Sequence, residues 1–185
     1  MVARKVVVEG QITHHGMLAT GADFLLREYD ERIESKPDGR FYFLLASVMF
    51  SAFQVEGSIN VIGEKLLGNA WPERLSWREK VKLIFAIRGD NADFGSDPLQ
   101  TVSKLFKIRD QWAHPKLQLI AGEFQYDPFG PDINDPLIPN MVRIITLDFA
   151  KTCSSEADAF FHKLVDMSGV GYLETMTHAT ERGVS

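Results

Sequence analysis

Cysteine is nearly absent from this sequence, and long apolar runs are absent altogether. Cys153 is the single cysteine in 185 residues, which excludes an intrachain disulfide and a zinc site built from paired cysteines. No apolar run approaches the roughly 20 residues that a membrane-spanning helix needs, because the richest stretch, residues 41–53, leads into Gln54 and Glu56. The apolar run at residues 6–8 is too short for a secretion signal. We therefore expect a soluble, cytoplasmic protein that does not contact a membrane.

The chain also lacks an overall excess of positive charge. Its formal net charge is −5, which argues against a protein that binds nucleic acid over its whole surface. The charge is uneven, however: residues 74–116 hold nine Lys or Arg against five Asp or Glu. A basic segment on an acidic body is compatible with one localised phosphate-contacting face.

Helical periodicity dominates the sequence. Apolar residues recur at helical spacing over about 17–33, 41–67, 76–89, 98–114 and 149–167. The second segment is apolar nearly all round in its first half, as expected for the buried centre of a bundle. We predict a mainly α fold, an antiparallel four- to five-helix bundle in one domain over residues 1–168, with a C-terminal tail over 169–185.

Several helix ends are marked by capping residues. Ser76 and Glu79 form a Ser-x-x-Glu capping box, and Gly89 is expected to close the same helix. Asp97 is predicted to cap the next helix, and Asp148 the last.

A small β element is also predicted. Residues 5–8 read as a short strand, and residues 117–147 contain two β-rich stretches, 117–126 and 141–147. Between them, residues 129–140 form a polar loop with three prolines. His14 and His15 fall in a predicted loop. Because no third ligand is near, they are not expected to bind a metal.

The most informative motif closes the fourth helical segment. Residues 107–116 read KIRDQWAHPK, so Arg109 and His114 lie in the last turns before Pro115, which ends the helix. This motif resembles the signature of the HEPN family, an Arg followed by a polar residue and then a His. Upstream, Glu56 and Asn60 resemble the acidic and amide residues often found on the long central HEPN helix. The resemblance covers residues 41–116.

The resemblance implies metal-independent RNA cleavage at a composite site in a homodimer. The residue types fit that chemistry: a histidine can accept the proton of an RNA 2′-OH near neutral pH, and an arginine can stabilise the phosphorane with two hydrogen bonds. On an ideal helix, however, Arg109 and His114 diverge by about 140°. The helix end, or a second copy across a two-fold axis, must therefore bring them together. No cofactor or metal is expected.

The remaining site residues have supporting roles. Asp110 is expected to orient Arg109 or a water molecule. Glu56 and Asn60, one turn apart, either bond Arg109 and the helix end or form a buried polar pair that fixes helix register. Lys107 and Lys116 flank the motif and either contact RNA phosphates or remain solvated.

Three functions stay open from the sequence. The first is a dimeric HEPN endoribonuclease with a toxin or defence role and a neutralising protein partner. The second is a catalytically silent HEPN-like module that binds RNA, nucleotide or a protein. The third is a helical interaction protein whose motif is accidental.

Overall fold

The computed structural model describes residues 6–11, 13–31, 40–114 and 143–184. Its α-helices are α1 (His15–Glu31), α2 (Arg40–Leu67), α3 (Trp77–Ile87), α4 (Leu99–Ala113) and α6 (Leu147–Ser168). The shorter elements are β1 (Val6–Gln11), the 3-10 helices η1 (Gly68–Ala70) and η3 (Tyr172–Thr175), and β2 (His178–Val184). The predicted mainly helical fold is confirmed.

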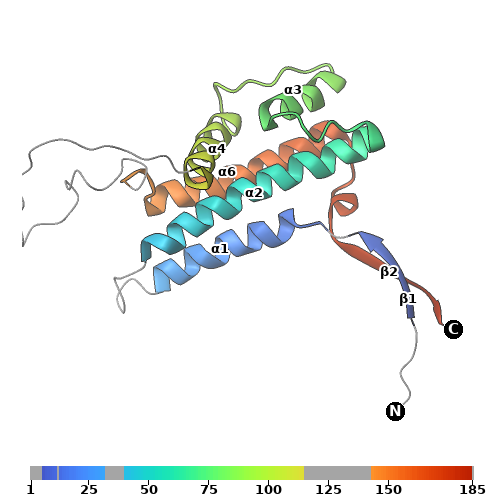
Figure 1. The fold of residues 1–185 in the computed structure, drawn as a ribbon, viewed down its shortest axis with the longest axis horizontal. Helices are drawn as coiled ribbons and strands as arrows, with labels where there is room; N and C mark the ends of the chain where they lie inside the picture. Colours follow the sequence, from blue (N-terminus) through green and yellow to red (C-terminus); the bar gives the residue numbers. More distant parts are fainter. Residues whose placement is uncertain (1–5, 12, 32–39, 115–142, 185) are drawn as a thin grey trace, which may run out of the picture.

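Helix α2 is the centre of the fold, and α1, α3, α4 and α6 all pack against it (Figure 1). Among the described residues it is the one helix long and apolar enough to cross a membrane by length and composition. Half of its most apolar window is buried by the other helices, so that apolar character is used in packing. Buried residues of α2 such as Val48, Val55 and Ile62 form the core with Leu105 of α4 and Phe160 of α6.

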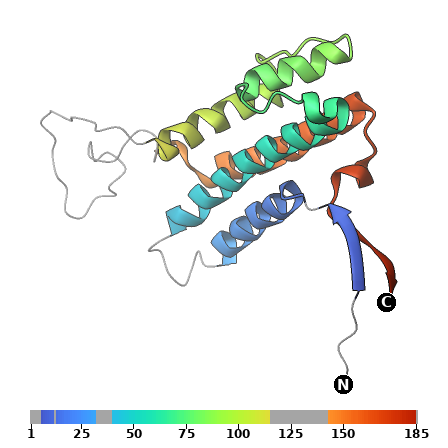
Figure 2. The same ribbon diagram turned by 45° about the vertical axis from the view of Figure 1, so that its right-hand side comes forward.

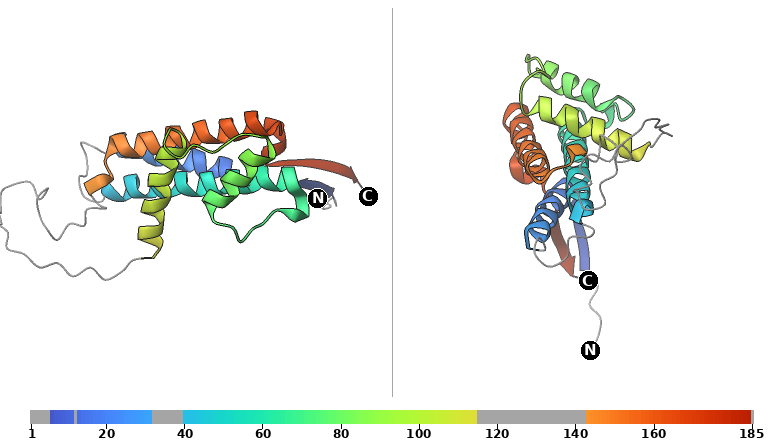
Figure 3. Two further views of the ribbon diagram at one scale, coloured as in Figure 1. Left: turned by 90° about the horizontal axis from the view of Figure 1, so that it is seen from above. Right: turned by 90° about the vertical axis from the view of Figure 1, so that its left-hand side faces the viewer.

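The helix directions differ from the predicted antiparallel bundle. Helix α1 runs antiparallel to α6, because Asp30 contacts Lys151 at one end of the pair and His15 contacts Phe161 at the other. It also runs antiparallel to α2, so α2 and α6 run parallel to each other (Figure 2). Helix α4 crosses this layer steeply (Figure 3).

Helix capping follows the sequence closely at α3 but not at α4. The Ser76 and Glu79 capping box is present, and Gly89 follows the C-cap with a φ of 74°, which is why a glycine suits that position. At α4 the predicted cap is wrong. The N-cap is Pro98, without a side-chain capping hydrogen bond, and the Asp97 carboxylate accepts from the backbone N–H and hydroxyl of Thr101, one turn inside the helix.

The start of α6 corrects two predictions. Thr146, rather than Asp148, is the N-cap, and its hydroxyl accepts from the N–H of Phe149 at 3.2 Å. The strand predicted over 141–147 is wrong for its described part, because residues 143–144 are helical and Leu147 already belongs to α6. The rest of the predicted 117–142 β region and loop lies outside the described residues.

The two ends of the described chain form a strand pair. β1 overlaps the strand predicted over residues 5–8 and pairs antiparallel with β2, from Gln11 opposite His178 to Val6 opposite Val184. β2 lies in the segment predicted as a tail. Its sequence, HATERGV, has no apolar alternation, so the pairing depends on backbone hydrogen bonds that composition does not predict.

His15 is placed differently from the predicted loop. It begins α1, is only 2% exposed, and its ring lies 4.8 Å from the Phe161 ring. Gly57 of α2 makes room for it, since a Cβ added there would lie 3.3 Å from His15 Cβ. Neither ring nitrogen of His15 has a hydrogen-bond partner among the described residues.

Candidate functional site

Arg109 lies in the last turn of α4 between two carboxylates. Its Nη2 donates to Glu56 Oε2 of α2 at 3.2 Å, and its Nη1 is 3.2 Å from Asp110 Oδ1. The guanidinium carbon also lies 5.0 Å from the centre of the Phe106 ring. These contacts fix the direction of the guanidinium. The arginine side chain is 20% exposed, so solvent still reaches it.

Two buried N–H groups on the same face of α4 have no acceptor within the part of the chain that the structure describes. They are Arg109 Nε and Trp112 Nε1, three residues apart. Trp112 packs against the core, with its ring centre 6.2 Å from that of Phe41. A buried donor without an acceptor typically costs about 1–3 kcal/mol.

His114 is the C-cap of α4, as the sequence predicts. Its backbone N–H donates to the carbonyl of Asp110 at 2.9 Å, and its side chain is exposed. Within the described residues the imidazole makes no hydrogen bond or ion pair, and Arg109 is bonded to Glu56 and Asp110 instead. One copy of the chain therefore carries the arginine and the histidine at one helix end without joining them.

Asn60 belongs to a different polar cluster from the one predicted for it. Its Oδ1 accepts from Lys80 Nζ at 2.8 Å and from Trp71 Nε1 at 3.4 Å, and it makes no bond to Arg109. Lys80 is only 7% exposed, and its ammonium lies 5.7 Å from the Trp71 ring centre. The partners of Asn60 are therefore Lys80 and Trp71, and not Arg109 or Glu56, the partners that the sequence suggested.

Sequence reasoning missed Lys80 and Trp71. The signal for Trp71 was Gly63, because a Cβ there would lie 2.3 Å from the indole, so only glycine leaves room. Lys80 gave no signal, since a lysine in the first turns of a capped helix ordinarily points to solvent.

A small cavity connects the two clusters. Its volume is about 80 Å³, enough for a few water molecules and too small for a nucleotide. It is lined by Glu56, Ile59, Asn60, Glu73, Leu75, Trp77 and Lys80. Glu56 thus contacts Arg109 on one side and faces the Lys80 cluster on the other. The predicted pair Glu56 and Asn60 lies in one place, but only Glu56 serves the motif.

The structure describes one of the two lysines that flank the motif. Lys107 is exposed on α4. Lys116 lies outside the described residues.

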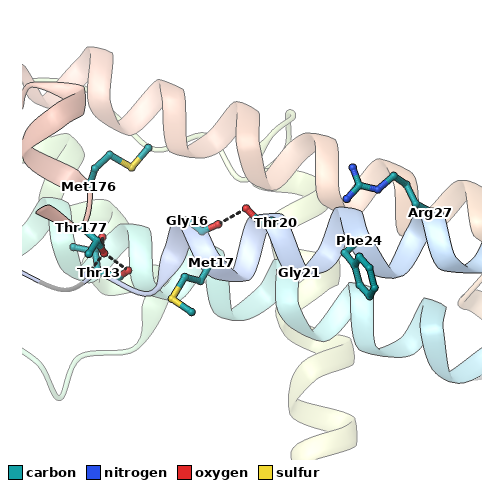
Figure 4. A pocket seen from close by; sticks show the side chains of 9 residues that line it. All are labelled: Thr13, Gly16, Met17, Thr20, Gly21, Phe24, Arg27, Met176 and Thr177. Atoms are coloured by element: carbon teal, nitrogen blue, oxygen red, sulfur yellow. Dashed lines mark hydrogen bonds between the residues drawn. The ribbon is translucent and has the colours of Figure 1, made fainter.

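A larger groove of about 590 Å³ lies along α1, away from the motif (Figure 4). Apolar side chains such as Met17 and Phe24 line it, and Arg27 lies at one end. No residue of the Arg–His motif reaches it.

No protein-family model, curated protein or solved structure matches this chain. The functional argument therefore depends on the geometry of these residues.

Proposed function

We propose that this protein is a metal-independent endoribonuclease of HEPN type, which cleaves RNA through its own 2′-OH at a composite site in a homodimer. The observation that carries the proposal is the end of α4. There Arg109 is oriented by Glu56 from the central helix, and an exposed His114 follows at the C-cap. The packing of α4 on a long central helix that supplies a carboxylate is compatible with a HEPN-like bundle.

The reaction assigns one role to each side chain. The imidazole of His114 accepts the proton of the 2′-OH, whose oxygen attacks the adjacent phosphorus while the bond to the 5′ oxygen breaks. That leaving oxygen takes a proton from the His114 imidazolium of the second copy. Arg109 stabilises the charge that develops on the phosphoryl oxygens. The products carry a 2′,3′-cyclic phosphate and a 5′-OH.

Asp110 acts against this chemistry in the free protein. Its carboxylate holds Arg109 Nη1, the edge that a phosphate would need, while Glu56 holds Nη2. Asp110 is 56% exposed, so an RNA phosphate can displace it more easily than it can displace Glu56. Glu56 then keeps the guanidinium in place.

The test is cleavage of a mixed tRNA and mRNA pool in EDTA. Arg109→Ala and His114→Ala should each lower the rate by about 10²–10⁴-fold. The matched controls are Arg27→Ala and His14→Ala. They change an exposed arginine on α1 and the exposed histidine just before α1, and both variants should cleave RNA like the native chain. Sedimentation should show a dimer. Circular dichroism checks that each variant is folded.

Asp110→Asn gives a sharper readout. Freeing one edge of Arg109 should raise the cleavage rate, whereas loss of a purely structural ion pair would leave the rate unchanged or lower it.

A second candidate function is a catalytically silent HEPN-like module. It is favoured by one observation, the engagement of both Nη atoms of Arg109 by carboxylates. A folded dimer that leaves the RNA pool intact, with Asp110→Asn equally inert, would establish this candidate over the enzyme.

A further inference from the structure

Arg78, the second residue of α3, is an exposed arginine that aromatic rings hold in place. Its guanidinium carbon lies 5.1 Å from the ring centre of Trp77 and 4.8 Å from that of Phe94, which comes from the loop between α3 and α4. Those two rings meet edge to face at 5.7 Å. An exposed arginine usually samples many rotamers, and two ring contacts restrict it before any ligand binds.

No carboxylate neutralises Arg78 among the described residues. The neighbouring Glu79 carboxylate is engaged by the backbone N–H and hydroxyl of Ser76. Asp93, in the same loop as Phe94, accepts from the N–H of Gly95. Arg78 therefore differs from Arg109, which has two carboxylate partners, and its hydrogen-bonding fork remains available to an anion.

One aromatic stack connects Arg78 to Arg109. The Trp77 ring lies parallel to the Phe106 ring, with centroids 4.4 Å apart and 7° between the planes. Phe106 in turn lies under the guanidinium of Arg109 at 5.0 Å. The two arginines are thus connected through two stacked rings by three contacts, each between 4.4 and 5.1 Å long.

Two guanidinium groups that aromatic rings hold in place suit a flexible polyanion with regularly spaced charges. A single RNA strand has one phosphate per nucleotide, and its backbone can pass both groups within a few nucleotides. The Trp77 ring is already engaged, because it is stacked on Phe106 and in contact with the Arg78 guanidinium, so the group left to a ligand is the guanidinium. The contact should therefore be to phosphate and independent of base identity.

We propose that Arg78 is a second phosphate-binding residue, which holds the RNA strand a few nucleotides from the phosphate at Arg109. This inference rests on the proposed function, because it takes RNA as the ligand. Two rings, Trp77 and Phe106, lie between the contacts of Arg78 and those of Arg109, so we assign Arg78 to substrate binding: its loss should raise KM and leave kcat unchanged.

The experiment measures binding by fluorescence anisotropy. The probes are fully 2′-O-methylated oligonucleotides of about 12 nucleotides, one of uridine and one of adenosine, which the proposed reaction cannot cleave. Arg78→Ala should weaken binding of both probes by the same factor, about tenfold at low salt. The slope of log K against log salt should fall by about 0.7, the loss of one phosphate contact on a single strand.

Matched variants separate charge from structure. Arg27→Ala removes an exposed arginine on α1, on the other side of α2, and should leave affinity and slope unchanged. Arg78→Lys keeps the charge and should retain most of the slope. Trp77→Leu should lower affinity by releasing Arg78 from its ring while the salt slope is retained.

The outcomes separate this inference from the proposed enzyme. RNA cleavage by the native chain with no effect of Arg78→Ala on KM, affinity or slope overturns the inference and leaves the enzyme standing. Binding that depends on Arg78 without any cleavage supports the inference and favours the silent module. An unequal effect on the two probes overturns the phosphate contact in favour of base recognition, and no binding by the native chain overturns both proposals.

Discussion

The stability of this fold should fall below pH 6.5 because of one buried histidine. His15 is 2% exposed, and both of its ring nitrogens lack a hydrogen-bond partner among the described residues. Burial lowers the pKa of His15 from its ordinary 6.5, because the charged imidazolium is poorly solvated there. Protonation therefore favours the unfolded chain: the contribution of His15 to stability is intact above pH 6.5 and is lost as the pH falls towards the lowered pKa.

The size of the effect has an upper bound. The uptake of one proton on unfolding changes the free energy of unfolding by at most about 1.4 kcal/mol per pH unit. The perturbation is His15→Leu, with His15→Phe as a second variant of different volume. Neither side chain titrates, so both variants should lack this slope even if their packing against Phe161 gives them different stabilities at pH 8.

The assay is urea unfolding between pH 5 and 8, with the difference in unfolding free energy between native chain and variant taken at each pH. This subtraction removes the contribution of the carboxylates to the pH dependence, because they titrate in all three proteins. The difference should grow as the pH falls below 6.5, and equally for both variants. A flat difference would show that His15 is hydrated or paired when folded, and the reasoning from burial would be refuted.

Three further predictions concern the core and the Lys80 cluster. Gly63→Ala should destabilise the fold by about 1–3 kcal/mol in urea unfolding, because the new Cβ overlaps the Trp71 ring. Asn60→Leu should cost about 1–3 kcal/mol by leaving the buried Lys80 ammonium without its acceptor, and adding Lys80→Met should recover part of that loss. Cys153 is buried, which raises the pKa of its thiol to about 12, so a thiol reagent at pH 8 should modify it only when the chain unfolds.

Each of these has a control and a contrary result. Gly16→Ala should be tolerated, since its nearest neighbour would be Met176 Sδ at 4.0 Å, and equal losses at Gly16 and Gly63 would contradict the packing argument. Full additivity of the Asn60 and Lys80 changes would show that the pair is not coupled. Rapid modification of Cys153 in the native chain would contradict its burial.

The helices could be predicted because their signals are local. The 3.6-residue periodicity places α2 at 41–67 against the observed Arg40–Leu67, and the capping box fixes the start of α3 at Ser76. Each of these signals lies within a few residues of the feature that it predicts. The helix directions depend instead on the connections, and the parallel alignment of α2 and α6 was therefore missed.

A site residue could be predicted from the sequence only where its partners lie close to it along the chain. Arg109, Asp110 and His114 are neighbours on one helix, and the structure keeps them at its end. The partner of Asn60 could not be found, because Lys80 lies 20 residues away on another helix. The burial of His15 depends on Gly57 and Phe161, and nothing adjacent in the sequence marks it.

The pairing of β1 with β2 has a consequence for the order of folding. Gln11 opposite His178 closes a loop of about 165 residues, which in an unfolded chain costs about 4–5 kcal/mol of entropy before any strand hydrogen bond compensates it. A two-stranded ribbon cannot recover that cost alone. Once the helices have packed, the same ends are already close, and the cost has been met. The ribbon should therefore form last, and a pair of dyes on its two strands would report the completed fold.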